Sequence, residues 1–393
     1  MKFSTRSAWD RSPGELARLS EQARARGLVA DLTESNPTAV GLSADAAALA
    51  RALSDGGNGA YDPHPQGLLS ARETVSEWLD ARGVSAPPSR IVLTASTSEA
   101  YSLLLKLLCD PGDAVLIPQP SYPLFDMLLR LDSVVGVPYR LKLSDRWRLD
   151  VDAVAACLPE SARALFVVNP NNPTGSLVSQ DEAAGLGALC REHGLALISD
   201  EVFAEFRWSS NSEGVASSAP RSLLPAGAAA GALTASLSGL SKACGLPQLK
   251  LGWIALGGPD ALVDEALARL DLIADTYLSV STPVQRGLPA LLALGDTFRE
   301  RMNERIETNL AALRTALPGT GCHLLPAEAG WYAVIELAAG RDENEVTRVL
   351  AEEHRVLVHP GWYFDLPGHH LVISLLPEPP TFSRALPLLL AGQ

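Results

Sequence analysis

Short hydrophobic runs alternate with longer mixed segments through the middle of the chain, from about Arg90 onward. Each run is apolar or β-branched, and each is followed by a helix-sized or longer mixture of polar and apolar residues. Continuous runs of this kind are typical of strands buried on both faces, so the pattern predicts a mainly parallel sheet covered by helices on both sides. Ligands of such sheets bind at the carboxyl ends of the strands. The runs are RIVLTA from Arg90, DAVLIP from Asp113, RALFVVN from Arg163, LALISD from Leu195 and ALTASLS from Ala232.

The pattern changes after about Pro289. A long charged helix is predicted for DTFRERMNERIETNLAALRTAL, and strands and short helices follow it. The first segment, MKFSTRSAWDRSPGELARLSEQARARG, mixes charged residues with Ala and Leu, which predicts an amphipathic surface helix. We therefore expect two lobes. Residues 1–44 would form an N-terminal arm and part of a small domain, residues 45–288 a large ligand-binding domain, and residues 289–393 a small C-terminal domain.

The composition of the 393-residue chain narrows the class of function. A formal net charge of -13 and a pI near 5.0 argue against a nucleic-acid or anionic-membrane surface, so small molecules are the expected partners. The five cysteines show no C-x-x-C pair and no matched histidine spacing. Neither a zinc site nor a disulfide framework is indicated, and a reducing cytoplasm is the expected location. Segment 222–241 is uncharged over a membrane-spanning length, but its proline, glycines and serines favour loop and strand.

Two polar turns follow predicted strands. After RIVLTA, the segment STSEAYSLLLKLL begins a helix with hydroxyl residues. Free N–H groups and the positive end of the helix dipole make such a turn an anion site, although a plain N-cap explains it equally well. After RALFVV, the segment NPNNPTG from Asn169 to Gly175 predicts a rigid turn whose side-chain amides either face a ligand or only shape the turn.

Two charged residues end further strands. Asp200 closes LALISD, and a carboxylate there needs a partner, which is either a cationic ligand group or another part of the protein. Lys242 follows ALTASLSGLS, where a lone lysine is usually solvated. Near an anion site and a buried carboxylate, however, a lysine can form a Schiff base. A carboxylate for a ring nitrogen, a lysine for an aldehyde and a hydroxyl-rich helix start for a phosphate together describe a pyridoxal-phosphate site.

With these motifs, the chain resembles the class I/II aminotransferases of the fold-type-I pyridoxal-phosphate enzymes over nearly its full length. The resemblance implies an α/β fold, in which a large domain has a mainly parallel seven-stranded sheet flanked by helices and binds pyridoxal phosphate. A smaller α/β domain would come from the N- and C-terminal segments. It also implies a homodimer with shared active sites. The matching segments, in the family's order, are YDPHPQGLLSARE, TASTSEA, PSYPLF, NPNNPTG, SDEVF, SLSGLSK, GWYAV and HPGWYF.

The resemblance implies a role for each matching residue. Lys242 is similar to the lysine that bonds to the cofactor and later shuttles the proton. Asp200 resembles the partner of the ring nitrogen, and Asn172 the asparagine that hydrogen-bonds the phenolic oxygen. Tyr122 resembles the aromatic residue stacked on the ring. Further expected contacts are Ser96, Thr97 and Ser98 in the phosphate cup, Ser238 and Ser241 as added hydroxyl groups, and Tyr61, which resembles a tyrosine that reaches a phosphate in the neighbouring subunit.

Three positions depart from the family's pattern. Lys250 stands where an arginine usually grips the phosphate, so the charge is kept but the planar fork is lost, and looser cofactor binding is expected. Phe203 stands where a tyrosine often donates to the phenolic oxygen. Val372 stands where an arginine usually clamps the substrate α-carboxylate. Asn36 is expected to fold over the site, and Trp331, with Tyr277 and Tyr332, is a candidate for the pocket wall, although core packing explains such aromatics as well.

The resemblance implies an aminotransferase that acts on an amino acid or related amine and a keto acceptor by a ping-pong aldimine mechanism. A carbon–sulfur β-lyase on the same scaffold is the alternative, and release of ammonia without an acceptor would distinguish it. A pyridoxal-phosphate sensor domain of a regulator would need a DNA-binding module, which the acidic chain argues against.

Overall fold

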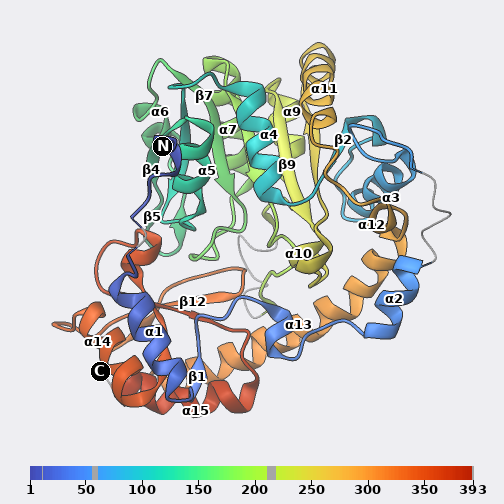
Figure 1. Ribbon diagram of the computed structural model, residues 1–393. Helices are drawn as coiled ribbons and strands as arrows, with labels where there is room; N and C mark the ends of the chain where they lie inside the picture. Colours follow the sequence, from blue (N-terminus) through green and yellow to red (C-terminus); the bar gives the residue numbers. More distant parts are fainter. Residues whose placement is uncertain (11, 55–60, 210–217, 392–393) are drawn as a thin grey trace.

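The computed structural model describes residues 1–10, 12–54, 61–209 and 218–391 (Figure 1). A seven-stranded sheet forms the upper part of the molecule in this view, with helices on both sides, and a four-stranded sheet lies below it. The predicted α/β fold with a mainly parallel seven-stranded sheet is confirmed. In spatial order, its strands are β2 (Ile91–Thr94), β10 (Gly252–Gly257), β9 (Thr234–Gly239), β8 (Ala196–Asp200), β7 (Ala162–Val168), β3 (Ala114–Gln119) and β4 (Val135–Arg140).

All five predicted hydrophobic runs are strands of this sheet. Strands β9, β8, β7, β3 and β4 are mutually parallel, whereas β10 runs antiparallel to both of its neighbours. Val168 pairs with Asp200, and Asp200 pairs with Leu237, so β7, β8 and β9 end at the same edge of the sheet. This register brings together the polar turns that follow these three strands.

Alternate residues of the strands pack on opposite faces, as the period of a strand requires. Phe166 and Ile198 belong to a core with α4, α5 and α11, whereas Leu165 and Leu197 belong to a core with α6 and α7. The helices of the large sheet region are α3 (Leu69–Asp80), α4 (Thr97–Leu108), α5 (Leu124–Asp132), α6 (Val151–Ala156), α7 (Gln180–His193), α9 (Leu224–Ala230), α10 (Leu240–Ala243), α11 (Asp260–Asp275) and α12 (Thr282–Arg286).

The four-stranded sheet has the order β11 (His323–Leu324), β12 (Tyr332–Glu336), β15 (His370–Ser374) and β14 (His359–Pro360). The N-terminal segment joins this part of the molecule, because β1 (Ala30–Asp31) pairs with β13 (Val356–Leu357) and Ser374 N donates to Leu32 O at 2.7 Å. The remaining helices are α1 (Glu15–Ala25), α2 (Ala46–Ser54), α13 (Leu288–Ala316), α14 (Glu343–Val349) and α15 (Pro379–Ala391), and a small hairpin joins β5 (Lys142–Leu143) to β6 (Trp147–Arg148).

Helix α13 is longer than the charged segment that predicted it. It begins at Leu288, and its first turns carry Leu288, Leu291 and Leu292 into a core shared with α3 and α10. Its later turns pack Met302 and Ile306 into the core of the four-stranded sheet. The helix therefore connects both cores, and Figure 1 shows it running along the lower side of the molecule. None of the described helices is long and apolar enough to cross a membrane.

Candidate active site

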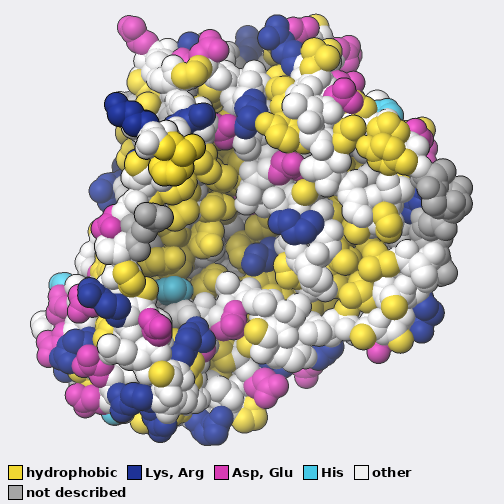
Figure 2. All heavy atoms as spheres, in the orientation of Figure 1, with side chains coloured by type: hydrophobic (Ala, Val, Ile, Leu, Met, Phe, Trp, Pro, Cys, Tyr) yellow, Lys and Arg dark blue, Asp and Glu magenta, His cyan; other side chains and the backbone are white. Residues whose placement is uncertain are grey.

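A cavity of about 200 Å³ lies at the edge where β7, β8 and β9 end. Val168, Asp200 and Gly239, the last residues of these strands, all line it. Figure 2 shows the hollow between the upper and lower parts of the molecule, with hydrophobic side chains around it. Of the residues predicted for the site, the cavity brings together Ser96, Thr97, Tyr122, Asn172, Asp200, Phe203, Ser241 and Lys242.

Asp200 is held by two hydrogen bonds at the floor of the cavity. The Tyr101 hydroxyl donates to Oδ2 at 2.6 Å, and the Val202 N–H donates to Oδ1 at 3.1 Å. Burial raises the pKa of the Asp200 carboxyl, while these hydrogen bonds and the Lys242 charge act against that rise. The pKa of Tyr101 is raised well above its ordinary value by burial and by the Asp200 charge. The carboxyl is thus fixed in place to meet a cationic ligand group.

Lys242 projects into the cavity from the short helix α10, directly after β9. Its Nζ lies 4.8 Å from the ring centroid of Trp331 and 5.8 Å from that of Phe203. Burial lowers the pKa of the Lys242 amine to about 8, and the charges of Asp200 and Glu34 oppose this change. A larger fraction of this amine is therefore unprotonated near neutral pH than of an ordinary lysine, as a nucleophilic amine requires.

Asn172 lies on the turn after β7, and its side chain faces the cavity. Its Oδ1 is buried and has no hydrogen-bond partner among the described residues. The turn is closed by the Gly175 N–H, which donates to Asn171 O at 2.9 Å. Gly175 has φ +65°, and a Cβ there would lie 2.3 Å from Ala329 O, so the position requires glycine. The close contact fixes the turn, and with it the amide of Asn172.

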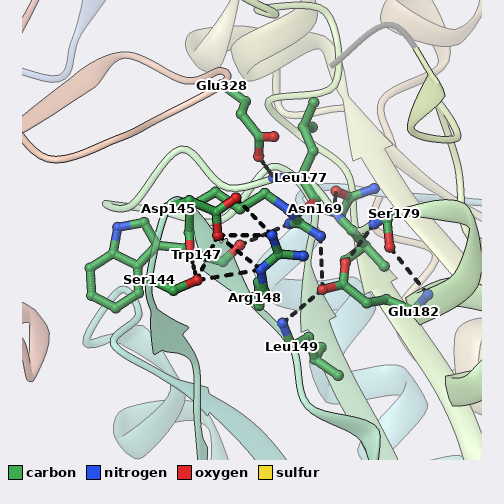
Figure 3. A network of polar contacts seen from close by, with 12 residues as sticks. Ser144, Asp145, Trp147, Arg148, Leu149, Asn169, Leu177, Ser179, Glu182 and Glu328 are labelled. Carbon is green, nitrogen blue, oxygen red and sulfur yellow. Dashed lines mark hydrogen bonds and ion pairs between the residues drawn. The ribbon is translucent and has the colours of Figure 1, made fainter. Parts of the chain in front are cut away.

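A polar network supports the same turn from behind (Figure 3). The Val178 N–H donates to Asn169 Oδ1 at 3.0 Å, and the Leu177 N–H donates to Glu328 Oε2 at 2.8 Å. Glu182 accepts from Ser179 N at 2.7 Å and from Leu149 N at 3.1 Å. The chain segment that follows the turn is therefore anchored by Asn169, Glu182 and Glu328.

The start of α4 also faces the cavity through Ser96 and Thr97. Ser96 is the N-cap, since its Oγ accepts from Glu99 N at 3.1 Å, and Glu99 Oε2 accepts from Ala95 N at 2.5 Å. Next to this turn, Gly239 and Gly252 bring β9 and β10 close together. A Cβ on Gly239 would lie 2.7 Å from the Gly252 Cα. The positive end of α4 thus lies beside backbone that carries no side chain, and both line the cavity.

The remaining predicted site residues do not line the cavity of the single chain. Ser238 is buried in β9, and Lys250 is exposed at φ 52° after the turn Pro247–Leu249. Tyr61 is 69% exposed and, with Tyr277, lines a separate hollow of about 30 Å³. Ser98 lies in the first turn of α4. The roles expected for these residues stay predictions.

The two residues expected on the substrate side lie in different surroundings. Asn36 is exposed and caps its own turn, because its Oδ1 accepts from Thr38 N at 3.1 Å. The neighbouring Ser35 lines the cavity instead. Trp331 is fully buried in the core beside the four-stranded sheet, with one ring face toward Lys242, whereas Tyr332 lines the cavity.

Tyr101 is the main site residue that the sequence did not predict. Its segment, STSEAYSLLLKLL, gives it the position of an ordinary core residue, and its ring does pack against Phe125 and Phe166. The signal that was present is its place in the second turn of the predicted anion-binding helix, because that helix begins beside the strand ends. Within the described ranges, His, Cys, Asp and Glu side chains form no group of three that could hold a metal ion.

Val372 lies on the face of the four-stranded sheet that carries Tyr332. Residues paired directly across antiparallel strands share a face. Tyr332 pairs with Ser374, and Val372 pairs with both Val334 and His359, so these side chains lie on one side of the sheet. Burial lowers the pKa of His359 to about 4, which leaves its imidazole neutral at pH 7. Among the described cavity-lining residues, Lys242 is the one cationic side chain.

Comparisons with known proteins agree with this architecture. The family described as aminotransferase class I and II matches residues 30–378. A glutamate-pyruvate aminotransferase of Haemophilus influenzae is 26% identical over 321 residues, which cover 79% of this chain and 77% of that protein. An S-alkyl-thiohydroximate lyase of Arabidopsis thaliana is also 26% identical over 321 residues, covering 79% and 67%. An aminotransferase structure from Escherichia coli has a TM-score of 0.84 at 22% identity, covering 100% of this chain and 98% of the other.

Proposed function

Since the chain belongs to the class I and II aminotransferases, we propose that it transfers an amino group from an amine donor to a keto acceptor at the cavity beside Lys242. One observation supports this proposal above the others. The amine of Lys242, the carboxyl of Asp200 and the amide of Asn172 lie in one cavity at the ends of three adjacent strands. Asp200 ends β8, Asn172 lies on the turn after β7, and Lys242 lies on the short helix after β9. The register of the sheet brings these three groups to one cavity.

The family uses pyridoxal phosphate, and the residues present fit that group. The buried Oδ1 of Asn172 has no partner among the described residues, and the Lys242 amine lines the same cavity. We propose that Asp200 faces the ring nitrogen, Asn172 the phenolic oxygen and Tyr122 the ring face. The phosphate would lie at the start of α4. Its proposed ligands are Ser96, Thr97, Ser98, Ser238, Ser241 and Lys250 of the same chain and Tyr61 of a second copy.

When bound, pyridoxal phosphate supplies an electron-withdrawing ring that acidifies the carbon bearing the substrate nitrogen. Lys242 is the proposed proton carrier, because its amine is buried beside the cavity and its pKa is lowered to about 8. Asp200, held by Tyr101, supplies a fixed carboxylate to a protonated ring nitrogen. Leu124, Phe125 and Val202 give part of the same cavity an apolar lining. Donor and acceptor would occupy the site in turn.

A homodimer with shared sites belongs to the proposal. It is supported by the exposed aromatic rings of Tyr61 and Tyr277, which line the same surface hollow. We also propose the domain boundaries near residues 44 and 288, supported by the pairing of β1 with β13 and by the start of α13 at Leu288. A cytoplasmic location is proposed from the five cysteines, among which the structure records no disulfide.

Borohydride reduction of the purified protein, followed by peptide mapping, tests the central assignment. The cofactor label is expected on the Lys242 peptide, and Lys242→Ala should abolish turnover while retaining cofactor through the phosphate and ring contacts. A label on another peptide, or no label, would contradict the assignment.

The second candidate is a carbon–sulfur lyase, which the similarity to the plant thiohydroximate lyase favours. Both activities need the same proton carrier, so the cavity does not separate them. Incubation of the holoenzyme with a β-thio-substituted amino acid and no keto acceptor distinguishes them. Stoichiometric turnover without ammonia supports transamination, and continuous ammonia release supports the lyase.

A further inference from the structure

The amine of Lys242 lies near two aromatic side chains that come from different parts of the chain. Its Nζ is 4.8 Å from the Trp331 ring centroid and 5.8 Å from the Phe203 ring centroid. The two rings contact each other edge to face, with centroids 5.2 Å apart and planes at 76°. Together, these two rings form what we call the aromatic cradle of Lys242.

The position of the Trp331 ring is fixed from several sides. Trp331 is fully buried, and its carbonyl accepts from Leu375 N at 2.8 Å. The preceding Gly330 donates its N–H to Phe206 O at 2.8 Å. The Phe206 ring also packs against the indole, with centroids 5.0 Å apart at 70°. An indole held this firmly has little freedom to move away from the Lys242 amine.

The cradle exerts two opposite effects on the amine. Removing water favours the neutral amine, and this effect is the larger one, because burial lowers the pKa of Lys242 to about 8. The negative face of an aromatic ring favours the ammonium instead. The other charges that act on the amine are Asp200, at the end of β8, and Glu34, before the turn Pro37–Val40, and both also favour the ammonium.

We propose that Trp331 is a positioning residue that holds the Lys242 amine against its ring face and stabilises the ammonium form there. The ring makes the buried amine able to accept a proton again, which a proton carrier needs and which burial alone would oppose. The inference rests on the proposed role of Lys242. Its measurement is made on the protein without cofactor, so its outcome is separate from the borohydride mapping of that role.

The comparison of Trp331→Phe with Trp331→Leu isolates the contribution of the ring. The two replacements are apolar and similar in volume, but only phenylalanine retains a π face. The chain has five lysines, so competitive labelling with limiting acetic anhydride across pH 6–11, read by peptide mass spectrometry, follows Lys242 against Lys2, Lys106, Lys142 and Lys250. The pKa of Lys242 should be about half to one unit lower in Trp331→Leu than in Trp331→Phe. An equal or higher value in the leucine variant overturns the proposal.

Trp147→Leu is the matched control. Trp147 is buried in the same hydrophobic cluster as Trp331. The indole nitrogens of both residues have no hydrogen-bond partner among the described residues. Trp147 is not part of the Phe203–Trp331 ring pair, so its loss should leave the Lys242 pKa unchanged. A shift as large as that of Trp331→Leu would mean a general loss of packing and would overturn the proposal. If Trp331→Leu does not fold, Trp331→Met against Trp331→Phe gives the same test, because methionine is also apolar and lacks a π face, and the same lower pKa of Lys242 is expected.

Discussion

Tyr101 donates a hydrogen bond of 2.6 Å from its hydroxyl to Oδ2 of Asp200. The bond joins α4, whose first turn faces the cavity, to the last residue of β8. It therefore links the proposed phosphate end of the site to the proposed partner of the ring nitrogen. Because Tyr101 also packs against Phe125 and Phe166, the hydroxyl has a fixed position from which to orient the carboxylate.

Tyr101→Phe should weaken cofactor binding. A hydrogen bond to a charged group contributes about 1.5–3 kcal/mol, so the dissociation constant for pyridoxal phosphate should rise roughly tenfold or more. Fluorescence titration of the cofactor-free protein measures this directly. Tyr139→Phe is the matched control, because Tyr139 is equally buried but donates to Phe166 O at 2.9 Å. Equal affinities in the two variants would contradict the assigned role.

The buried carboxyl of Glu201 should make the free energy of unfolding depend on pH. It is buried next to Asp200, and burial raises its pKa from 4.5 to about 7, against hydrogen bonds from Ser236 Oγ, Leu223 N and Ser222 Oγ. The folded protein keeps this proton up to about pH 7, whereas the unfolded chain loses it near pH 4.5. The free energy of unfolding therefore falls as pH rises through this window.

Glu201→Gln removes that dependence. As the pH rises from 5 to 8, the free energy of unfolding of the variant should increase by on the order of 1–3 kcal/mol relative to that of the wild type. Urea denaturation of both proteins at several pH values gives the difference. Parallel stability curves for variant and wild type would show that Glu201 does not titrate in this range.

Phe203→Tyr should restore a donor at the proposed phenolic oxygen of the cofactor. Phe203 lines the cavity, and a hydroxyl on its ring would favour the unprotonated form of the cofactor–lysine linkage. The pKa of the bound cofactor's absorption change should fall by about one unit. A spectral pH titration measures it, with Phe125→Tyr, which adds a hydroxyl to another wall, as control. No fall, or an equal fall in the control, would remove Phe203 from this position.

Five strands of the sheet were predictable because they are buried and so leave continuous apolar runs in the sequence. The edge strand β4 has several exposed residues and was not among those runs. Asp200 and Asn172 were predictable for a related reason, since polar residues that directly follow parallel strands must meet at one edge. Strand β10 was not among the predicted runs. Its segment, GWIALG, pairs antiparallel between β2 and β9, and the connections along the chain do not reveal that placement.

Tyr101 and Trp331 show where the sequence is insufficient. The Tyr101 hydroxyl reaches Asp200 only because α4 packs on one face of the large sheet, and the residues are 99 positions apart. The Trp331 ring meets Lys242 because Phe206 and Leu375 fix the start of β12. Both contacts depend on packing between distant segments, and local hydrophobic patterns do not reveal such packing.

The last prediction concerns the donor, and it follows from the face of the small sheet that carries Val372. A guanidinium there would bind a carboxylate through two charge-assisted hydrogen bonds. The chain instead offers Val372 beside His359, which is neutral at pH 7 because burial lowers its pKa to about 4. The negative charge of Glu34 also acts on both Tyr332 and Lys242, and it would repel a carboxylate bound next to them.

We therefore expect alanine, aspartate and glutamate to be poor sole donors, and amines without an ionised α-carboxylate to be better ones. The matched probes are L-alanine and L-alaninamide, which differ mainly in that charge. A guanidinium clamp is worth several kcal/mol and would favour alanine by about a hundredfold or more. In the absence of such a clamp, kcat/KM for the half-reaction, followed as loss of the cofactor's absorption band, should be equal or higher for alaninamide. A strong preference for alanine would mean that a cation outside the described lining, for example on a second copy of the chain, binds the carboxylate.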